Sequence, residues 1–211
     1  MRRIVVFLLA VLLAAPMGNV SAQNLSKAIK KEYKAKMKQL KKEKWELYGS
    51  SRTLEVTLSK YYEALDANPN VREIMGLAPR FKSKSVGHQT AINDACRTYA
   101  QQCGSTVKGR IDSDMASDGL DVKSEFDHFY AAYERTVEKE IQGELQEKFS
   151  IIRQIDKEKG DPIYEMQTYF LVDEEAASRA RIRAYEQALK ESEAAQKMAN
   201  KIGDFVKAGF E

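Results

Sequence analysis

The segment Ser85–Ile111, SVGHQTAINDACRTYAQQCGSTVKGRI, has apolar residues at helical spacing along one side. This stripe consists of Ile92, Ala95, Cys96, Tyr99, Cys103, Val107 and Ile111. The same side also has small residues, at Ala91, Ala95, Ala100 and Gly104. Such a helix can lie close to a flat surface. The preceding run, Arg72–Lys82, is a candidate strand, so we expect the helix to pack on a sheet.

The segments that follow this helix complete a simple order of elements. Asp121–Ile141 is expected to be a second helix, and Glu147–Asp156 and Ile163–Val172 are expected to pair as a β-hairpin. Asp173 caps a long terminal helix. This order predicts an α+β fold: a small antiparallel sheet of about three strands, with two long alanine-bearing helices packed on one face, plus an amphipathic basic N-terminal helix.

Three local features limit how these elements can be arranged. Pro79 has no amide hydrogen, so the strand at Arg72–Lys82 should lie at a sheet edge or contain a bulge. The segment Asp112–Asp121 is rich in Asp, Ser and Gly and is expected to be a turn. As one rod, Asp173–Ala208 would be about 54 Å long. We therefore expect a bend near Glu191–Ser192 and a contact with the N-terminal helix; a straight helix that projects from the domain and meets a coiled partner is the alternative.

The start of the chain has the pattern of a secretory signal peptide. Met1–Ala22 contains two arginines, an apolar run and small residues at the expected cleavage site. We divide the chain into the signal peptide at 1–22, a basic helix with a Trp/Gly-Ser connector and a short helix at 23–70, and an α+β domain with a long C-terminal helix at 71–211. A retained membrane anchor is the alternative, although the apolar run is shorter than the roughly 20 residues that span a bilayer.

The segment Asn24–Lys44 is expected to form an amphipathic helix with a narrow apolar stripe at Leu25, Ile29, Tyr33, Met37 and Leu40. Its other faces carry lysines that could contact anionic lipid or an envelope polyanion: Lys27, Lys30, Lys31, Lys34, Lys38, Lys41 and Lys42. For this segment we expect a solvated lysine face whose apolar stripe packs on the protein body, the usual case for a charge run, with contact to an anionic surface as the alternative. The formal charge falls from +3 to +1 without residues 1–22, so this basic charge is local.

Residues with catalytic or metal-binding chemistry are few. Cys96 and Cys103 would lie about 10.5 Å apart along a continuous helix, so we expect buried free thiols; a bridge between chains or a helix broken at Gly104 are the alternatives. His88 and His128 begin no metal-ligand spacing. Turn and cap roles, with weak calcium binding as the alternative, are expected for Asp112, Asp114, Asp118 and Asp121. We predict no catalytic, cofactor-binding or metal-binding residues.

A family resemblance is carried by four segments: the run Arg72–Lys82, the helix containing AINDAC at Ala91–Cys96, the later hairpin, and the Ala176–Leu189 helix. Together they resemble the LPP-twenty family of bacterial envelope lipoproteins, which is related in fold to the N-terminal domain of the flagellar assembly protein T.

A second set of segments is similar to uncharacterised secreted proteins that carry this domain. It consists of Lys41–Trp45, then Gly49-Ser50, then LEVTL at Leu54–Leu58. The resemblance covers roughly Lys41 to Leu189. It implies an envelope location, and it brings no established enzyme activity or catalytic residues. The chain lacks the lipobox cysteine of the family, since its two cysteines are Cys96 and Cys103.

These observations lead to three hypotheses for function. The first is a non-catalytic interaction or structural module, secreted to the periplasm or envelope of a Gram-negative bacterium. The second is a peripheral binder of anionic lipid or an envelope polyanion through the Lys27–Lys44 helix. The third is a thiol-redox protein or another enzyme. We expect an envelope protein or an anionic lipid surface as partner, with no cofactor, no nucleic acid and no transmembrane helix in the mature chain.

Overall fold

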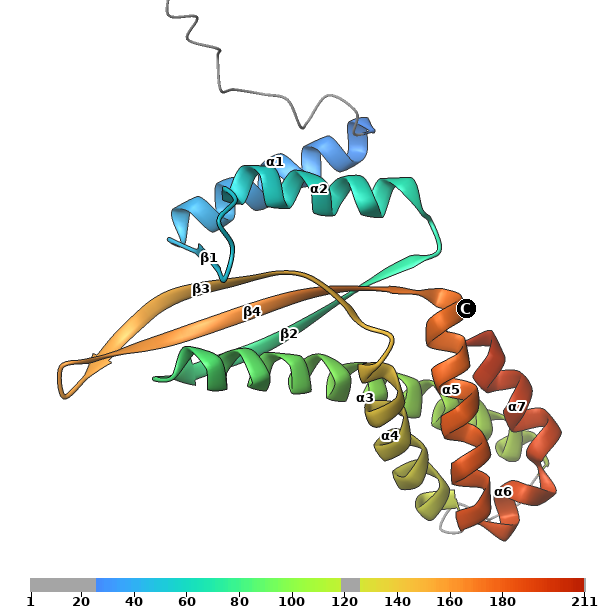
Figure 1. Ribbon diagram of the computed structural model, residues 1–211. Coiled ribbons are helices and arrows are strands. Elements are labelled where there is room, and N and C mark those ends of the chain that lie inside the picture. The colour runs from blue at the N-terminus through green and yellow to red at the C-terminus, as the bar shows by residue number, and fades with distance from the viewer. Residues whose placement is uncertain (1–25, 119–125, 211) are drawn as a thin grey trace, which may run out of the picture.

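The computed structural model describes residues 26–118 and 126–210, which fold around a four-stranded antiparallel sheet (Figure 1). The strand order is β1-β3-β4-β2, with β1 at Glu46–Tyr48, β2 at Val71–Phe81, β3 at Gln146–Glu158 and β4 at Asp161–Asp173. Helices cover both faces of the sheet. The expected α+β class is confirmed. The expected signal peptide lies outside the described residues.

β3 and β4 form the predicted hairpin at the centre of the sheet. Lys159 and Gly160 join them with φ values of 52° and 93°, the left-handed conformation that a two-residue hairpin turn of this kind requires. β2 pairs with β4 at the sheet edge, and its register shifts between Ala78 and Phe81. Both the edge position and the irregularity around Pro79 confirm the expectation drawn from the missing amide hydrogen.

β1 is a strand that the sequence analysis did not predict. It pairs with β3 from Glu46 opposite Ile152 to Tyr48 opposite Ser150. A strand of 3 residues is too short to show a period of two in its sequence, and it forms here because β3 offers it an edge.

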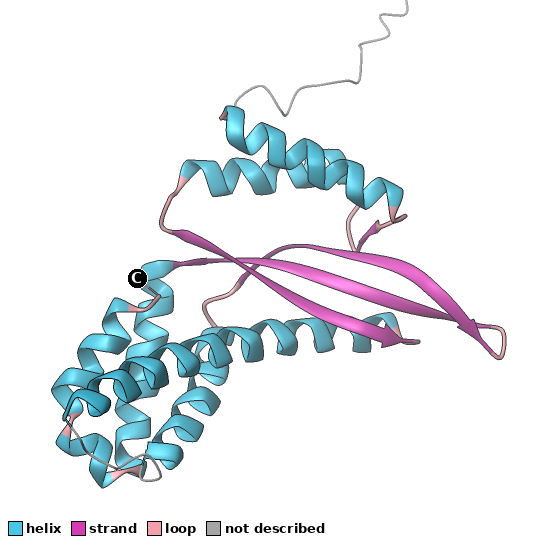
Figure 2. Ribbon diagram, turned by 180° about the vertical axis from the view of Figure 1, so that it is seen from behind, coloured by secondary structure: helices cyan, strands magenta, loops and turns pink. Residues whose placement is uncertain are grey.

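α3, Lys84–Asp118, runs along one face of the sheet (Figure 2). The closest approach is at Gly76 of β2, where an added Cβ would lie 1.8 Å from the carbonyl oxygen of Ala91. Ala91 and Ala95 are fully buried at this contact. The predicted packing of this helix on a sheet is confirmed, and it depends on small residues in both elements.

α1, Lys27–Lys42, and α2, Leu54–Ala67, cover the opposite face of the sheet (Figure 2). One hydrophobic cluster fills the layer between these helices and the sheet: Met37, Leu40, Trp45, Leu58, Tyr61, Phe149, Ile151, Tyr169 and Leu171. The sequence left open what covers this face, and the two N-terminal helices do so. Among the described helices, none combines the length and apolar character needed to cross a bilayer.

A helical bundle extends beyond one end of the sheet (Figure 1). Its main members are α4 at Asp127–Gln142, α5 at Glu174–Ala188 and α7 at Ala199–Ala208, which pack beside the second half of α3. Between α5 and α7 the chain passes through a 3-10 turn at Leu189–Glu191 and α6 at Glu193–Lys197. The alanine face of α5 packs chiefly against α4, so α3 provides most of the cover on this side of the sheet.

Two expectations for this part of the chain are wrong. The segment from Asp112 to Asp118 is helical rather than a turn, because Ile111 is fully buried and Asp114 forms an ion pair with Lys201 of α7. The terminal helix bends at Ser192, as expected, but it then folds back on α5 and α3 instead of contacting α1.

Candidate functional site

The candidate site is the lysine-rich outer surface of α1. The helix begins after Ser26, whose side chain accepts a hydrogen bond from the amide of Ile29 at 3.4 Å. The amide of Ser26 donates to Oδ2 of Asp66 at 2.9 Å, which ties the start of α1 to the end of α2. α1 itself has eight lysines and one glutamate in the sequence KAIKKEYKAKMKQLKK.

The apolar stripe of α1 faces the protein body. Met37 and Leu40 are 8% and 1% exposed. Tyr33 meets Tyr62 of α2 edge-on, with 6.1 Å between the ring centres. The expectation that this stripe packs on the body is confirmed for Tyr33, Met37 and Leu40, whereas Leu25 lies outside the described residues.

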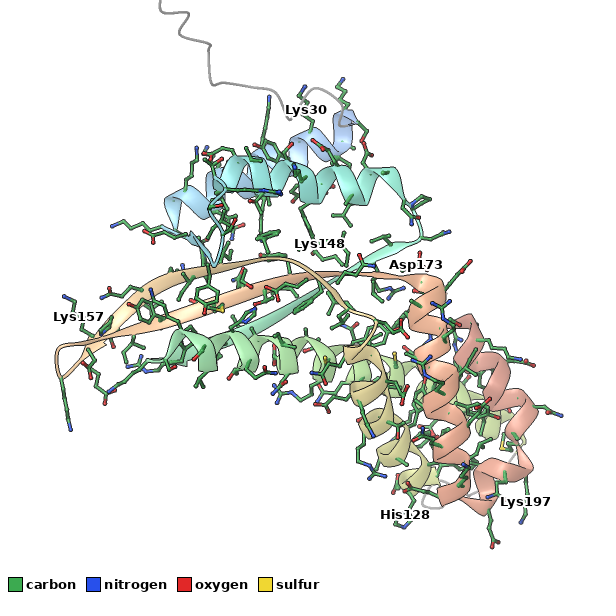
Figure 3. The ribbon with its side chains drawn as sticks, in the orientation of Figure 1. Lys30, His128, Lys148, Lys157, Asp173 and Lys197 are labelled. Carbon is green, nitrogen blue, oxygen red and sulfur yellow. The ribbon has the colours of Figure 1, made fainter. Side chains whose placement is uncertain are left out.

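The lysine stripe, as we call it, comprises five exposed residues: Lys27, Lys31, Lys34, Lys38 and Lys41. Their separations of four, three, four and three residues place them on one side of the helix. Lys42 is exposed next to the stripe, whereas Lys30 is half-buried. Figure 3 shows Lys30 near the start of α1, on the side remote from the sheet. The structure thus keeps the predicted lysines on one accessible surface.

Lys41 differs from the other stripe residues because it forms an ion pair with another described residue. Its Nζ lies 2.7 Å from Oε1 of Glu55 on α2. The hydrogen bond with Glu55 raises the pKa of Lys41, and the same bond lowers the pKa of Glu55. Since this pair is exposed, its contribution to stability is small. Lys41 therefore presents less uncompensated charge to an outside surface than Lys27 to Lys38.

Lys36 points toward the sheet rather than outward. Its Nζ lies 5.1 Å from the ring centre of Tyr169 on β4. Burial raises the pKa of the nearby Glu73 carboxyl, and the charge of Lys36 opposes that shift. The sequence analysis did not assign this inward role, although Lys36 lies three residues after Tyr33 and four before Leu40, a spacing that places it on the apolar side of the helix.

The two cysteines are free and buried, as expected. Both belong to the large core cluster of α3 and the bundle. Burial raises the pKa of Cys96 to about 11 and that of Cys103 to about 12. Neither side chain is therefore a thiolate near neutral pH, the form that thiol chemistry requires.

A polar cluster around His88 was not predicted. Nε2 of His88 lies 3.0 Å from Oε1 of Glu147, and this oxygen accepts a hydrogen bond of 2.7 Å from the hydroxyl of Ser150. The carboxylate stands between the hydroxyl and the imidazole, whereas in a catalytic triad the imidazole stands between the other two groups. His128 is exposed on α4 (Figure 3).

The acidic residues do not form a cation loop in the described part of the chain. Asp112 and Asp114 lie on α3, while the side chain of Asp118 and the whole of Asp121 are outside the described residues. Within the ranges 26–118 and 126–210, no group of three or more His, Cys, Asp or Glu side chains is placed to hold a metal ion.

Comparisons with known proteins give no family assignment: no family model, no curated protein and no solved structure matches this chain. The resemblance to the LPP-twenty family therefore stays a prediction.

Proposed function

We propose that this chain is an exported, non-catalytic module that docks on an anionic surface of the Gram-negative envelope through the lysine stripe of α1. One observation carries the proposal. The apolar side of α1 is buried under α2 and the sheet, while Lys27, Lys31, Lys34 and Lys38 stay exposed on its outer side. The contact is therefore electrostatic and leaves the helix in its place on the protein body.

The size of the expected effect supports this role. A lysine close to an anionic membrane surface contributes about 1 kcal/mol to binding. Four exposed lysines on one helix side, none of them in an ion pair with another described residue, are enough for reversible binding, but the attraction fades within a Debye length of about 8 Å at physiological ionic strength. Binding through this surface is accordingly sensitive to salt.

Co-sedimentation with lipid vesicles tests the proposal. We expect the protein to sediment with vesicles that contain phosphatidylglycerol at low salt, and to stay in solution with pure phosphatidylcholine vesicles or at high salt. Replacement of Lys27, Lys31, Lys34 and Lys38 by Gln should weaken binding by about a hundredfold or more.

A matched control carries the same loss of charge elsewhere. It replaces four exposed lysines on the bundle and the hairpin tip: Lys139, Lys157, Lys159 and Lys190. This control should bind anionic vesicles nearly as well as the unmodified protein. Equal weakening in both variants would mean that net charge matters and the stripe does not. A stripe variant that binds normally would reject α1 as the contact.

The thiol-redox alternative has less support. Both thiols are buried with raised pKa values, and the Ser150-Glu147-His88 order differs from that of a nucleophilic triad. A protein that presents a surface fits these features better than one that activates a nucleophile.

A further inference from the structure

A cavity of about 310 Å³ lies where the chain leaves the sheet after β1. Tyr48, the last residue of β1, lies opposite Ser150 of β3. Gly49 then adopts a left-handed backbone conformation with φ +68°, which turns the chain away from β3. The part of β3 that precedes Ser150 therefore has the cavity, and not a continuation of β1, beside it.

Four parts of the chain supply the walls of this cavity: the end of β1, the loop between β1 and α2, α2 itself, and the start of β3. The polar side chains among them include Ser50, Arg52, Thr57, Glu147 and Lys148. Figure 3 shows Lys148 on the side of β3 that faces α2. A volume near the lower end of the usual range of about 300–1,000 Å³ suits a small ligand or the end of a chain.

The hydroxyl of Thr57 is an unusual part of the wall. In three other helical threonines, Thr90, Thr106 and Thr136, the hydroxyl donates to the carbonyl oxygen four residues earlier. The Oγ1 of Thr57 is buried and has no hydrogen-bond partner within the described part of the chain. Because buried hydroxyls are as a rule hydrogen-bonded, the Thr57 hydroxyl points to a partner other than the described residues, and a ligand bound in the cavity that Thr57 lines would supply it.

The charges of the wall favour a single negative charge. Arg52 and Lys148 are opposed by Glu147 alone, so the polar wall side chains carry one positive charge in excess. The carboxylate of Glu147 is already engaged, since it accepts from Ser150 at 2.7 Å and lies 3.0 Å from Nε2 of His88. A doubly charged phosphate would leave one negative charge uncompensated here. A carboxylate carries a single negative charge, which matches the excess positive charge of the wall, and its two oxygens match the paired N–H donors of an arginine guanidinium.

We propose that this cavity binds a carboxylate group, with Arg52 as its main cationic contact and the hydroxyl of Thr57 as a hydrogen-bond donor. The site lies near the start of α2, where the helix dipole also favours negative charge. It lies off the lysine stripe and is independent of vesicle binding. The carboxylate can belong to the C-terminus of an extended peptide or to a small organic acid.

Calorimetric titration of the purified protein with matched probes tests this site. The first probe is acetyl-Ala-Ala with a free carboxylate, the second is the same dipeptide as its C-terminal amide, and the third is propionate. We expect the free carboxylate to bind and the amide to bind at least about tenfold more weakly. Tighter binding of the dipeptide than of propionate identifies a peptide terminus, and equal binding identifies a small acid.

Variants connect the binding to the named residues. Arg52→Gln should weaken binding of acetyl-Ala-Ala about tenfold, and Thr57→Val should weaken it while the thermal unfolding curve stays cooperative. Arg179→Gln, which removes an exposed arginine on α5, should bind as the unmodified protein does. Equal affinity for the amide, normal binding by Arg52→Gln, or no saturable binding of either carboxylate at millimolar concentration overturns the proposal.

Discussion

The backbone amide of Leu77 on β2 donates a hydrogen bond of 2.9 Å to Oδ2 of Asp94 on α3. β2 is an edge strand, so an outward amide at this position would otherwise be open to another chain. Two residues further on, where the next outward amide would lie, Pro79 has no amide hydrogen. The helix side chain and the proline together close this stretch of the edge to strand addition.

Removal of this cap should destabilise the protein. We expect Asp94→Ala to lower the free energy of unfolding by about 1.5–3 kcal/mol, the usual range for a hydrogen bond with a charged partner. Asp94→Asn should lower the free energy of unfolding by less, because its side-chain amide oxygen can still accept a hydrogen bond from the backbone amide of Leu77. Urea unfolding followed by circular dichroism measures both changes.

Arg97 provides the control for that experiment. It donates to the other carboxylate oxygen of Asp94 at 2.6 Å, and its side chain is 59% exposed. Arg97→Ala should therefore cost no more than about 1 kcal/mol. If it cost as much as Asp94→Ala, the ion pair and not the capped amide would account for the loss.

The contact between Gly76 and Ala91 leads to a second prediction. An added Cβ at Gly76 would meet backbone atoms of α3, which cannot move without shifting the helix. We expect Gly76→Ala to lower the free energy of unfolding by about 1–3 kcal/mol. The matched change Gly109→Ala, on the exposed side of α3 with nothing within 4 Å of the new methyl group, should raise it by up to about 1 kcal/mol. Destabilisation by both changes would contradict this account.

Periodicity in the sequence predicted the elements whose faces repeat over several turns. The stripe of α3, the hairpin of β3 and β4, and the edge position of β2 follow from patterns within each segment. β1 could not be predicted in this way, because its strand form depends on pairing with Ser150 to Ile152, about a hundred residues further along the chain. The helical state of Asp112 and Asp114 likewise depends on a distant partner, Lys201 of α7.

The candidate site also has features that the sequence predicts and features that depend on the folded chain. Helical spacing within α1 is enough to place Lys27, Lys31, Lys34 and Lys38 on one side of the helix. The inward direction of Lys36 follows from the same spacing, since Lys36 lies three residues after Tyr33 and four before Leu40, but its contact with Tyr169 of β4 depends on the fold. The cavity beside Thr57 could not be predicted from the sequence, because α2 and β3 meet there only in the folded chain.

The buried thiols predict a pH dependence of stability. Burial raises the pKa of Cys96 from 9.0 to about 11, so between these values the folded chain keeps a proton that the unfolded chain has lost. The stabilisation is complete below pH 9 and is lost as the pH rises toward 11. Urea unfolding across this range should show the decline, and a Cys96→Ala, Cys103→Ala variant should show a shallower one. If the free energy of unfolding of this variant declined with pH as steeply as that of the unmodified protein, buried tyrosines and not the thiols would account for the decline.

Trp45 offers a direct report on whether α1 stays in place during docking. It is the single tryptophan of the chain, it is 5% exposed, and its indole nitrogen donates to Oε2 of Glu43 at 2.9 Å just after α1 ends. The guanidinium of Arg153 lies 4.5 Å from the ring centre on the sheet side. Any movement of α1 away from the sheet must therefore disturb this ring.

We expect the Trp45 emission maximum to be the same in solution and on phosphatidylglycerol vesicles at low salt, because electrostatic docking leaves the apolar stripe buried. Lipids brominated in their acyl chains should not quench it. Unfolding in urea serves as the positive control, since it exposes the ring and shifts the emission to longer wavelength. Quenching by the brominated lipids would instead mean that α1 opens and inserts its apolar side, which would replace docking through the lysine stripe with an amphipathic insertion.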